Sequence, residues 1–295
     1  DSLYVSRRYF DNEIKKMHDV SNDMKFLWHP DQEKNQYTSV KKESSGGEIE
    51  ESIINVGKYK LTITSPWDTM SLDNADLYTH ISITKDGKII ENKEYKEFAF
   101  HHVYKVQVKD TSYYLLGLCG GGMHGCGLLV PIVNDGNNLV IGKTIENVDF
   151  SNYLRVEDFF TKNGDLYTVF DDSRYFFSYS GSNNASYNSA VPRIYKFDKV
   201  TGSAILSKDS FLEIYKESTK IIAKNLNDLN NSIPIEAKYL MTQTGRGRSL
   251  IPYFDYYLGM AIISDKIHSS EIRKAIEKLY TDFYGKKYLT EAHFD

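Results

Sequence analysis

The chain of 295 residues has no long apolar segment and no extended block of like charge. No run approaches the roughly 18 apolar residues that a membrane-spanning helix requires, so no transmembrane segment is expected. The net charge is −4, without the concentrated basic face that nucleic-acid recognition needs. Nucleic acid is therefore not an expected partner.

Several short motifs that identify enzyme or metal sites are also absent. There is no hydrolase nucleophile elbow, no dinucleotide-binding glycine loop and no zinc-binding helix, and the acidic segments lack the spacing of a calcium-binding EF-hand. The sequence therefore predicts no metal and no cofactor.

Aromatic side chains, by contrast, are abundant, because 23 Tyr and 15 Phe contribute to a 14% aromatic content. Tyrosine favours strands and combines an apolar ring with a polar hydroxyl, which suits half-exposed sheets and contact surfaces. The composition indicates a β-rich protein, with tyrosines available to cover sheets or to hold a partner.

The two ends of the chain differ from its centre. Residues 1–29 predict an amphipathic helix, because Leu3, Phe10, Met17 and Met24 fall seven apart. Residues 30–52 are polar and lack periodicity, which predicts a linker or loop. Residues 208–295 carry two further helical patterns and predict a C-terminal α+β region packed on the same domain.

Residues 53–207 favour antiparallel strands. Apolar and polar residues alternate in "YKLTITS", and glycine-bearing turns such as Asp86-Gly87 separate runs rich in Tyr, Phe, Val and Ile. The segment "RIYKFDKVTGSAIL" (193–206) resembles the strand–turn–strand units of β-propeller blades. The predicted fold is mainly β (α+β), with a central antiparallel meander, propeller-like or sandwich-like, flanked by an N-terminal helix and C-terminal helices.

The segment "LGLCGGGMHGCGLLVPIV" (116–133) holds both cysteines, Cys119 and Cys126, with four glycines and His124 between them. If the apolar flanks pair as a hairpin, the cysteines come close enough for a disulfide. A paired set with no cysteine left over suits an oxidising compartment. Inert thiols remain an alternative.

Metal binding and catalysis at this loop are further alternatives. Zinc could use Cys119, Cys126, His124 and one of His101 and His102, although adjacent histidines on a regular strand point to opposite faces. A nucleophilic Cys126 would need a base, and His124 lies only two residues away, whereas catalytic Cys–His pairs normally meet from distant parts of the sequence.

Other polar segments could bind a ligand. The Ser/Asn-rich segment 178–190 predicts a loop that carries Tyr179 and Tyr187, and Arg246 and Arg248 in "TGRGRS" could hold an anion. The pair Asp171-Asp172, together with Asp165, could supply carboxylates, although turn and strand-end roles are more common for such residues.

These observations rank three functions. The first is an exported, non-catalytic binding protein, periplasmic or extracellular, that holds a glycan or an envelope protein with its loops and aromatic surfaces. The sequence starts without methionine, and we expect that a signal peptide has been removed. The second is a hydrolase that combines the 119–126 loop with His101 or His102 and Asp171 or Asp172. The third is an inhibitor or immunity-type protein with a disulfide-closed loop.

Overall fold

The structure is a computed structural model of the chain. It describes residues 2–19, 24–28, 38–44, 47–66, 77–120, 126–146, 148–149, 158–172, 191–232, 260–261 and 263–264. The chain divides into two compact units. The larger comprises His18–Phe170 and Tyr195–Leu206, and the smaller comprises Asp1–Met17, Asp171–Ile194 and Ser207–Asp295.

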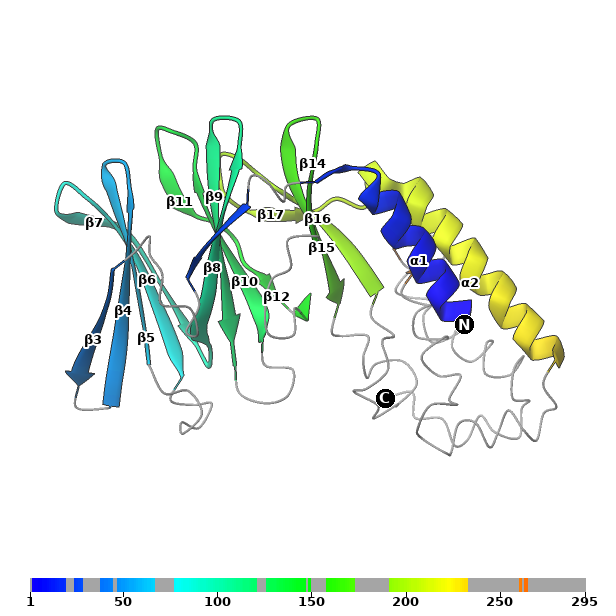
Figure 1. The fold of residues 1–295 in the computed structure, drawn as a ribbon, viewed down its shortest axis with the longest axis horizontal. Coiled ribbons are helices and arrows are strands. Elements are labelled where there is room, and N and C mark those ends of the chain that lie inside the picture. Colours follow the sequence, from blue (N-terminus) through cyan, green and yellow to red (C-terminus); the bar gives the residue numbers. More distant parts are fainter. Residues whose placement is uncertain are drawn as a thin grey trace. The chain divides into compact units, whose positions relative to one another are not determined.

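The structure contains three antiparallel sheets, so the predicted mainly β fold is confirmed (Figure 1). They belong to the larger unit except for residues 171–172 and 191–194 of the third sheet. The first sheet is a five-stranded meander in sequence order. Its strands are β3 (Thr38–Ser44), β4 (Gly47–Val56), β5 (Tyr59–Pro66), β6 (Tyr78–Lys85) and β7 (Lys88–Lys96).

The middle sheet has the strand order β11-β10-β9-β8-β2, and β12 also pairs with β10. Its strands are β2 (Met24–Trp28), β8 (Ala99–Val108), β9 (Thr111–Cys119), β10 (Cys126–Asn134), β11 (Leu139–Ile141) and β12 (Ile145–Glu146).

The third sheet has the order β1-β14-β15-β16-β17, and β13 also pairs with β15. Its strands are β1 (His18–Asp19), β13 (Val148–Asp149), β14 (Phe159–Lys162), β15 (Asp165–Asp172), β16 (Val191–Phe197) and β17 (Ala204–Leu206).

Two apolar clusters join the three sheets face to face. The first cluster packs Leu61 and Ile81 of the first sheet against Leu116 and Val130 of the middle sheet. The second cluster contains residues from the middle and third sheets, and it includes Val106, Tyr113, Leu115, Leu129, Phe159, Leu166, Phe170 and Phe197. The middle sheet is thus covered on both faces, which buries large apolar area and drives the packing.

The hairpin turns form where glycine follows a residue that tolerates positive φ. Asp86 and Gly87 have φ of 51° and 76° between β6 and β7, and Asn163 and Gly164 have φ of 56° and 80° between β14 and β15. Positive φ at both central positions is the requirement of a type I′ turn, whose twist matches the flanking strands. The predicted Asp86-Gly87 hairpin is confirmed.

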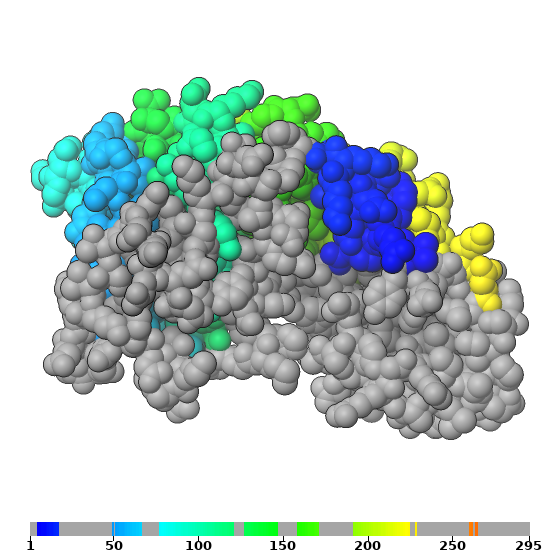
Figure 2. Space-filling view, viewed as in Figure 1, coloured from blue at the N-terminus to red at the C-terminus, as the bar shows by residue number. Residues whose placement is uncertain are grey.

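The smaller unit contains both described α-helices, α1 (Ser2–Lys15) and α2 (Leu212–Ser232), the latter preceded by the 3-10 turn η4 (Asp209–Phe211). The helices lie side by side, blue and yellow in Figure 2. Phe10 and Tyr215 are fully buried between them, with ring centroids 5.3 Å apart. The Ser6 hydroxyl also donates a hydrogen bond of 2.7 Å to the Ser218 carbonyl oxygen.

The predicted helix over residues 1–29 is wrong in its second half. The helix ends at Lys15, and Met24–Trp28 forms β2, which pairs with β8. Met24, Phe26 and Trp28 are also spaced by two, so the same residues satisfy a strand pattern. Pairing with a distant strand decides between the two, as tertiary contacts commonly override local propensity.

The predicted linker over residues 30–52 is also wrong in part. Thr38–Ser44 forms β3 and Gly47–Val56 forms β4, and these two strands pair along their length. β3 lies at the edge of the first sheet, where backbone hydrogen bonds can hold a polar strand that has no apolar periodicity. The second C-terminal helix, predicted over residues 269–283, lies outside the described residues.

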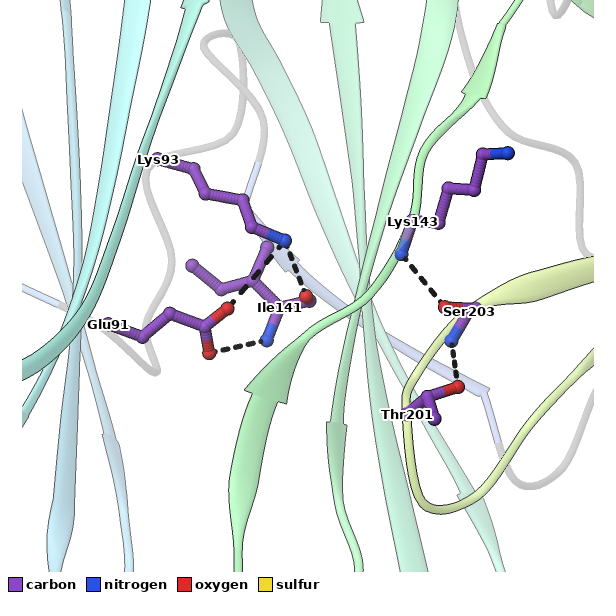
Figure 3. A network of polar contacts seen from close by, with 6 residues as sticks. All are labelled: Glu91, Lys93, Ile141, Lys143, Thr201 and Ser203. Carbon is purple, nitrogen blue, oxygen red and sulfur yellow. Dashed lines mark hydrogen bonds and ion pairs between the residues drawn. The ribbon is translucent and has the colours of Figure 1, made fainter.

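Residues 141–143 connect all three sheets, and we call this segment the seam (Figure 3). The Ile141 amide donates to the Glu91 carboxylate at 3.0 Å, and the Lys93 ammonium donates to the Ile141 carbonyl at 2.7 Å. These two side chains of β7 occupy the N–H and the C=O of Ile141 at the outer edge of β11. They therefore close an edge that would otherwise be open to another strand.

On its other side the seam contacts the β16–β17 turn. The Lys143 amide donates to the Ser203 hydroxyl at 3.3 Å. A side chain at Gly142 would approach the Gly202 carbonyl oxygen to 2.1 Å, so glycine is required for this close passage. The Gly142 amide donates to the Pro131 carbonyl oxygen. Pro131 lies opposite the gap between β11 and β12, so the N–H that proline lacks is not needed for a hydrogen bond to either strand.

Candidate functional site

The candidate site begins at the end of the β9–β10 hairpin, where the register places Cys119 directly opposite Cys126. The predicted hairpin is therefore confirmed. Directly opposite residues in an antiparallel pair have Cα atoms about 4.5–5.5 Å apart, and this separation suits a disulfide. The pairing shifts between Cys126 and Leu128, which marks a bulge beside the cysteine. The disulfide itself stays a prediction.

Two histidines lie next to this hairpin on β8. Phe100 pairs with Leu118 and His102 pairs with Gly117, so His101 is the additional residue of a β-bulge. The bulge breaks the alternation of a regular strand and brings the Nδ1 atoms of His101 and His102 to 3.0 Å from each other. The expectation that these adjacent histidines point to opposite faces is wrong, because a bulge redirects a side chain.

Gly117 gives His102 its position. The imidazole lies where a side chain on Gly117 would be, since a Cβ there would come within 2.3 Å of the ring. His102 is fully buried, and its ring meets that of Tyr104 edge-on at 5.7 Å between centroids. Glycine on β9 and the bulge on β8 together create the space for one buried imidazole.

Cys119 and His102 share one face of the middle sheet. Along β9, Gly117 and Cys119 are two residues apart and so point to the same side. Cys119 also packs against the apolar cluster between the middle and third sheets. The site thus combines a histidine pair and a cysteine pair at one end of the sheet.

Burial suppresses ionisation of the tyrosines further along β9. Burial, followed by the negative charges of Asp165 and Asp198, raises the pKa of Tyr113, and burial raises the pKa of Tyr114. Both phenols are neutral at physiological pH, because the anionic form is poorly solvated in a protein interior. They contribute to packing and cannot act as phenolate nucleophiles.

The predicted binding residues cannot be placed at this site. The residues His124, Tyr179, Tyr187, Arg246 and Arg248 all lie outside the described residues.

The carboxylates proposed for a hydrolase belong to the third sheet, whereas the histidines belong to the middle sheet. Asp171 and Asp172 end strand β15, and the structure describes their backbone alone. Asp165 contacts Lys196 at 2.6 Å and Lys199 at 3.2 Å, so it acts as an ion-pair partner within the third sheet. Within the described part of the chain, no group of three or more His, Cys, Asp or Glu residues is arranged to hold a metal ion.

The tyrosines with described side chains are buried or half-buried, rather than spread over an exposed surface. They are Tyr9, Tyr59, Tyr78, Tyr95, Tyr104, Tyr113, Tyr114, Tyr167, Tyr195 and Tyr215. The exposed large apolar side chains of the described residues are aliphatic instead. They are Val5, Ile89, Ile90, Val200, Ile205 and Leu206.

Two features of this region escaped the sequence-based predictions. The β8 bulge could have been suspected from Gly117, because an isolated glycine in an apolar strand often marks a close approach by another group. The seam had no such signal, since Glu91 and Lys93 resemble ordinary surface charges in "KIIENKEYK".

No helix in the described part of the chain is both long and apolar enough to cross a membrane. Comparison with known proteins finds no matching family model, no matching curated protein and no matching solved structure.

Proposed function

We propose that this protein is an exported, non-catalytic binding protein, periplasmic or cell-surface, and that its partner is another protein. The observation that carries the proposal is the placement of Cys119 directly opposite Cys126. Cross-strand cysteines at this separation form a disulfide readily in an oxidising compartment, whereas cytosolic thiols are kept reduced. A closed loop between them would have a fixed shape, which lowers the entropy lost on binding.

The exposed side chains favour a protein partner over a glycan. Sugar rings are held by exposed aromatic faces, yet the described tyrosines are buried or half-buried. Exposed aliphatic residues instead gather at two edge strands, with Ile89 and Ile90 on β7 and Ile205 and Leu206 on β17. Aliphatic side chains at strand edges suit the apolar contacts of a protein interface.

Trapping the thiols in cells tests the export proposal. Alkylation of the native protein before lysis, followed by intact-mass measurement, should leave Cys119 and Cys126 unmodified. Reduction before alkylation should add two labels. Fractionation of the same cells should recover the protein outside the cytoplasm. Two labels without reduction, or recovery in the cytoplasmic fraction, would remove the support for export.

Charge substitutions test the choice of partner. In crosslinking with an envelope extract, a specific protein adduct of the wild type should be lost in an Ile205→Lys, Leu206→Lys variant. Lys60→Glu, on an exposed position of β5, is a matched control and should retain the adduct. Binding to a glycan array without any protein adduct would instead support the glycan alternative.

A further inference from the structure

The β4–β5 and β6–β7 turns lie at the same end of the first sheet (Figure 1). The register places Tyr59 opposite Lys85 and Lys85 opposite Lys88, so these residues form one row across β5, β6 and β7. The side chains of interest around the two turns are basic or aliphatic, and we call them the basic tip. They are Lys58, Lys60, Lys85, Lys88, Ile89 and Ile90.

A β-bulge exposes two consecutive isoleucines at the basic tip. Neighbouring residues of β6 lie opposite Ile89 and Glu91, so Ile90 is the additional residue on β7. The bulge interrupts the alternation of a regular strand, and the side chains of Ile89 and Ile90 are 64% and 52% exposed. An exposed apolar patch that is surrounded by polar groups commonly marks a contact with a protein or a membrane.

Four lysines surround these isoleucines. Lys58 occupies the β4–β5 turn, and Lys60 lies in the same register row as Ile89. Lys58, Lys60 and Lys88 are exposed, and Lys85 is half-buried. Within residues 47–66 and 77–108, none of the four lysines takes part in an ion pair.

The acidic residues near the basic tip do not balance these lysines. Asp86 lies in the β6–β7 turn. Asp135, in the neighbouring β10–β11 turn, accepts two backbone amides of that turn, and Glu91 accepts the Ile141 amide at the seam. Four ammonium groups therefore outnumber three carboxylates, two of which already accept hydrogen bonds from backbone amides. The basic tip has a net positive charge and attracts an anionic surface.

We propose that the basic tip docks on the surface of a bilayer that contains anionic phospholipids. Ile89 and Ile90 enter the boundary between headgroups and acyl chains, and the lysines lie among the lipid phosphates. Charge attraction and shallow apolar insertion are each weak alone, and together they give stable attachment to a membrane surface. Asp86 and Gly87 hold a tight turn of positive φ, so little conformational entropy is lost on docking.

The composition of the basic tip favours a membrane over a protein partner. Its cations are all lysine, and the aromatic ring beside them is buried. Tyr59 is only 6% exposed, and the ammonium groups of Lys58 and Lys85 lie 5.4 Å and 5.8 Å from the centroid of its ring. Protein interfaces are enriched in aromatic residues and arginine and depleted in lysine, whereas lysine near an anionic bilayer contributes directly to attachment.

Membrane docking goes beyond the proposed binding function and does not depend on it. The basic tip belongs to the first sheet, whereas Ile205 and Leu206 belong to β17 of the third sheet and remain available to a protein partner. Docking is tested with purified protein and lipid alone, so its failure would leave the thiol and crosslinking tests of the binding function unaffected.

Flotation of the purified full-length protein with lipid vesicles tests the docking. The protein should float with vesicles of phosphatidylcholine and phosphatidylglycerol, and raised salt should release it. Binding to vesicles of phosphatidylcholine alone should be at least tenfold weaker, because the lysines then meet no net negative charge. Equal flotation with both kinds of vesicle would overturn the proposal.

Substitutions at the basic tip separate its two contributions. The double variant Ile89→Asp, Ile90→Asp should bind anionic vesicles at least tenfold more weakly, because a carboxylate cannot enter the acyl boundary. The double variant Lys85→Gln, Lys88→Gln should bind about 25-fold more weakly, since each lysine near an anionic bilayer contributes about fivefold. Ile89→Trp should give blue-shifted fluorescence relative to wild type when anionic vesicles are added.

Two exposed residues outside the basic tip provide matched controls. Ile205 on β17 is 55% exposed, and Lys96 at the other end of β7 is 84% exposed. Ile205→Asp and Lys96→Gln should therefore retain flotation with anionic vesicles. Unchanged flotation of Ile89→Asp, Ile90→Asp would overturn the proposal. An envelope-protein adduct that requires these isoleucines, without any flotation of the wild type, would instead assign the basic tip to a protein interface.

Discussion

The first and middle sheets are built from strands of similar length but differ in how many faces are covered. In β5, buried and partly or fully exposed residues alternate along the strand. In β9, every residue from Thr111 to Leu118 is buried. The difference arises because the first sheet packs on one side, whereas the middle sheet packs on both. Strand periodicity therefore reports the number of covered faces, rather than the presence of a strand.

This comparison explains two sequence patterns. "YKLTITS" alternates because its polar residues face solvent. "SYYLLGL" and "LLVPIV" are almost continuously apolar because neither face of these strands is exposed to solvent. A continuous apolar run can equally indicate a buried helix, and only its short length and flanking turns favour a strand.

The sharpest test substitutes two consecutive residues in each sheet. In the middle sheet, Leu115→Ala and Leu116→Ala should each lower the free energy of unfolding by about 2–5 kcal/mol, because both side chains are fully buried on opposite faces. In the first sheet, Leu61→Ala should cost a similar amount. Lys60→Ala, next to it on the exposed face, should change stability by less than about 0.5 kcal/mol.

Urea unfolding followed by far-UV circular dichroism measures these four changes. The comparison between the sheets is wrong if the losses in free energy of unfolding for Leu115→Ala and Leu116→Ala differ as widely as those for Leu61→Ala and Lys60→Ala. Such a difference would mean that one face of the middle sheet is open to solvent.

A smaller effect is expected where the two sheets meet at the seam. Glu91→Ala removes the acceptor for the Ile141 amide and should destabilise by about 1–2 kcal/mol, because a partly buried donor is left unpaired. Glu91→Gln retains an acceptor oxygen and should recover much of the loss. Thermal unfolding and light scattering should show a lower midpoint and more self-association for Glu91→Ala.

The same strand provides a matched control for this substitution. Glu94 and Lys96 lie on β7, and their side chains are 52% and 84% exposed. Glu94→Ala should therefore leave both midpoint and scattering unchanged. If Glu91→Ala and Glu94→Ala changed the unfolding midpoint and the scattering equally, general surface charge, rather than closure of the β11 edge, would protect the protein from unfolding and self-association.

The smallest effect concerns charge in the third sheet. Burial raises the pKa of Asp165, but hydrogen bonds and charge attraction from Lys196 and Lys199 outweigh it, and the net pKa is lowered. A carboxyl whose pKa is lower in the folded state stabilises the fold above its unfolded pKa, and this contribution is lost as pH falls through the folded value. Asp165→Asn should therefore cost at most about 1 kcal/mol at pH 7, and this cost should shrink as the pH falls below the unfolded pKa of the carboxyl.

Urea titrations of wild type and Asp165→Asn across this pH range provide the measurement. Lys196→Met should reproduce part of the loss at pH 7, and the double variant should cost less than the sum of the two. A difference that persists undiminished at low pH would assign the effect of Asp165→Asn to packing instead of charge.

Local patterns predicted much of the fold. The Asp86-Gly87 turn and the apolar flanks of Cys119 and Cys126 specify hairpins through residues that are close in sequence, so their pairing could be inferred directly. The strand Met24–Trp28 could not be inferred in this way, because its partner β8 is distant in sequence and the spacing of its apolar residues fits a helix equally well.

The candidate site was less predictable than the fold. The facing cysteines followed from the hairpin, but the contact of His101 with His102 depends on a bulge of one residue. A bulge shifts alternation without changing composition, and so it leaves little trace in the sequence.

The N-terminal elements pair with later parts of the chain in a nested order. β2 pairs with β8, β1 pairs with β14, and α1 packs against α2. As a nascent chain emerges, the first sheet can therefore form from contiguous residues, while β2, β1 and α1 must wait for progressively later partners. Residues 2–28 precede the first sheet in the chain but are completed after it, and their loss would leave one strand missing from each of two sheets and would remove the helix that packs against α2.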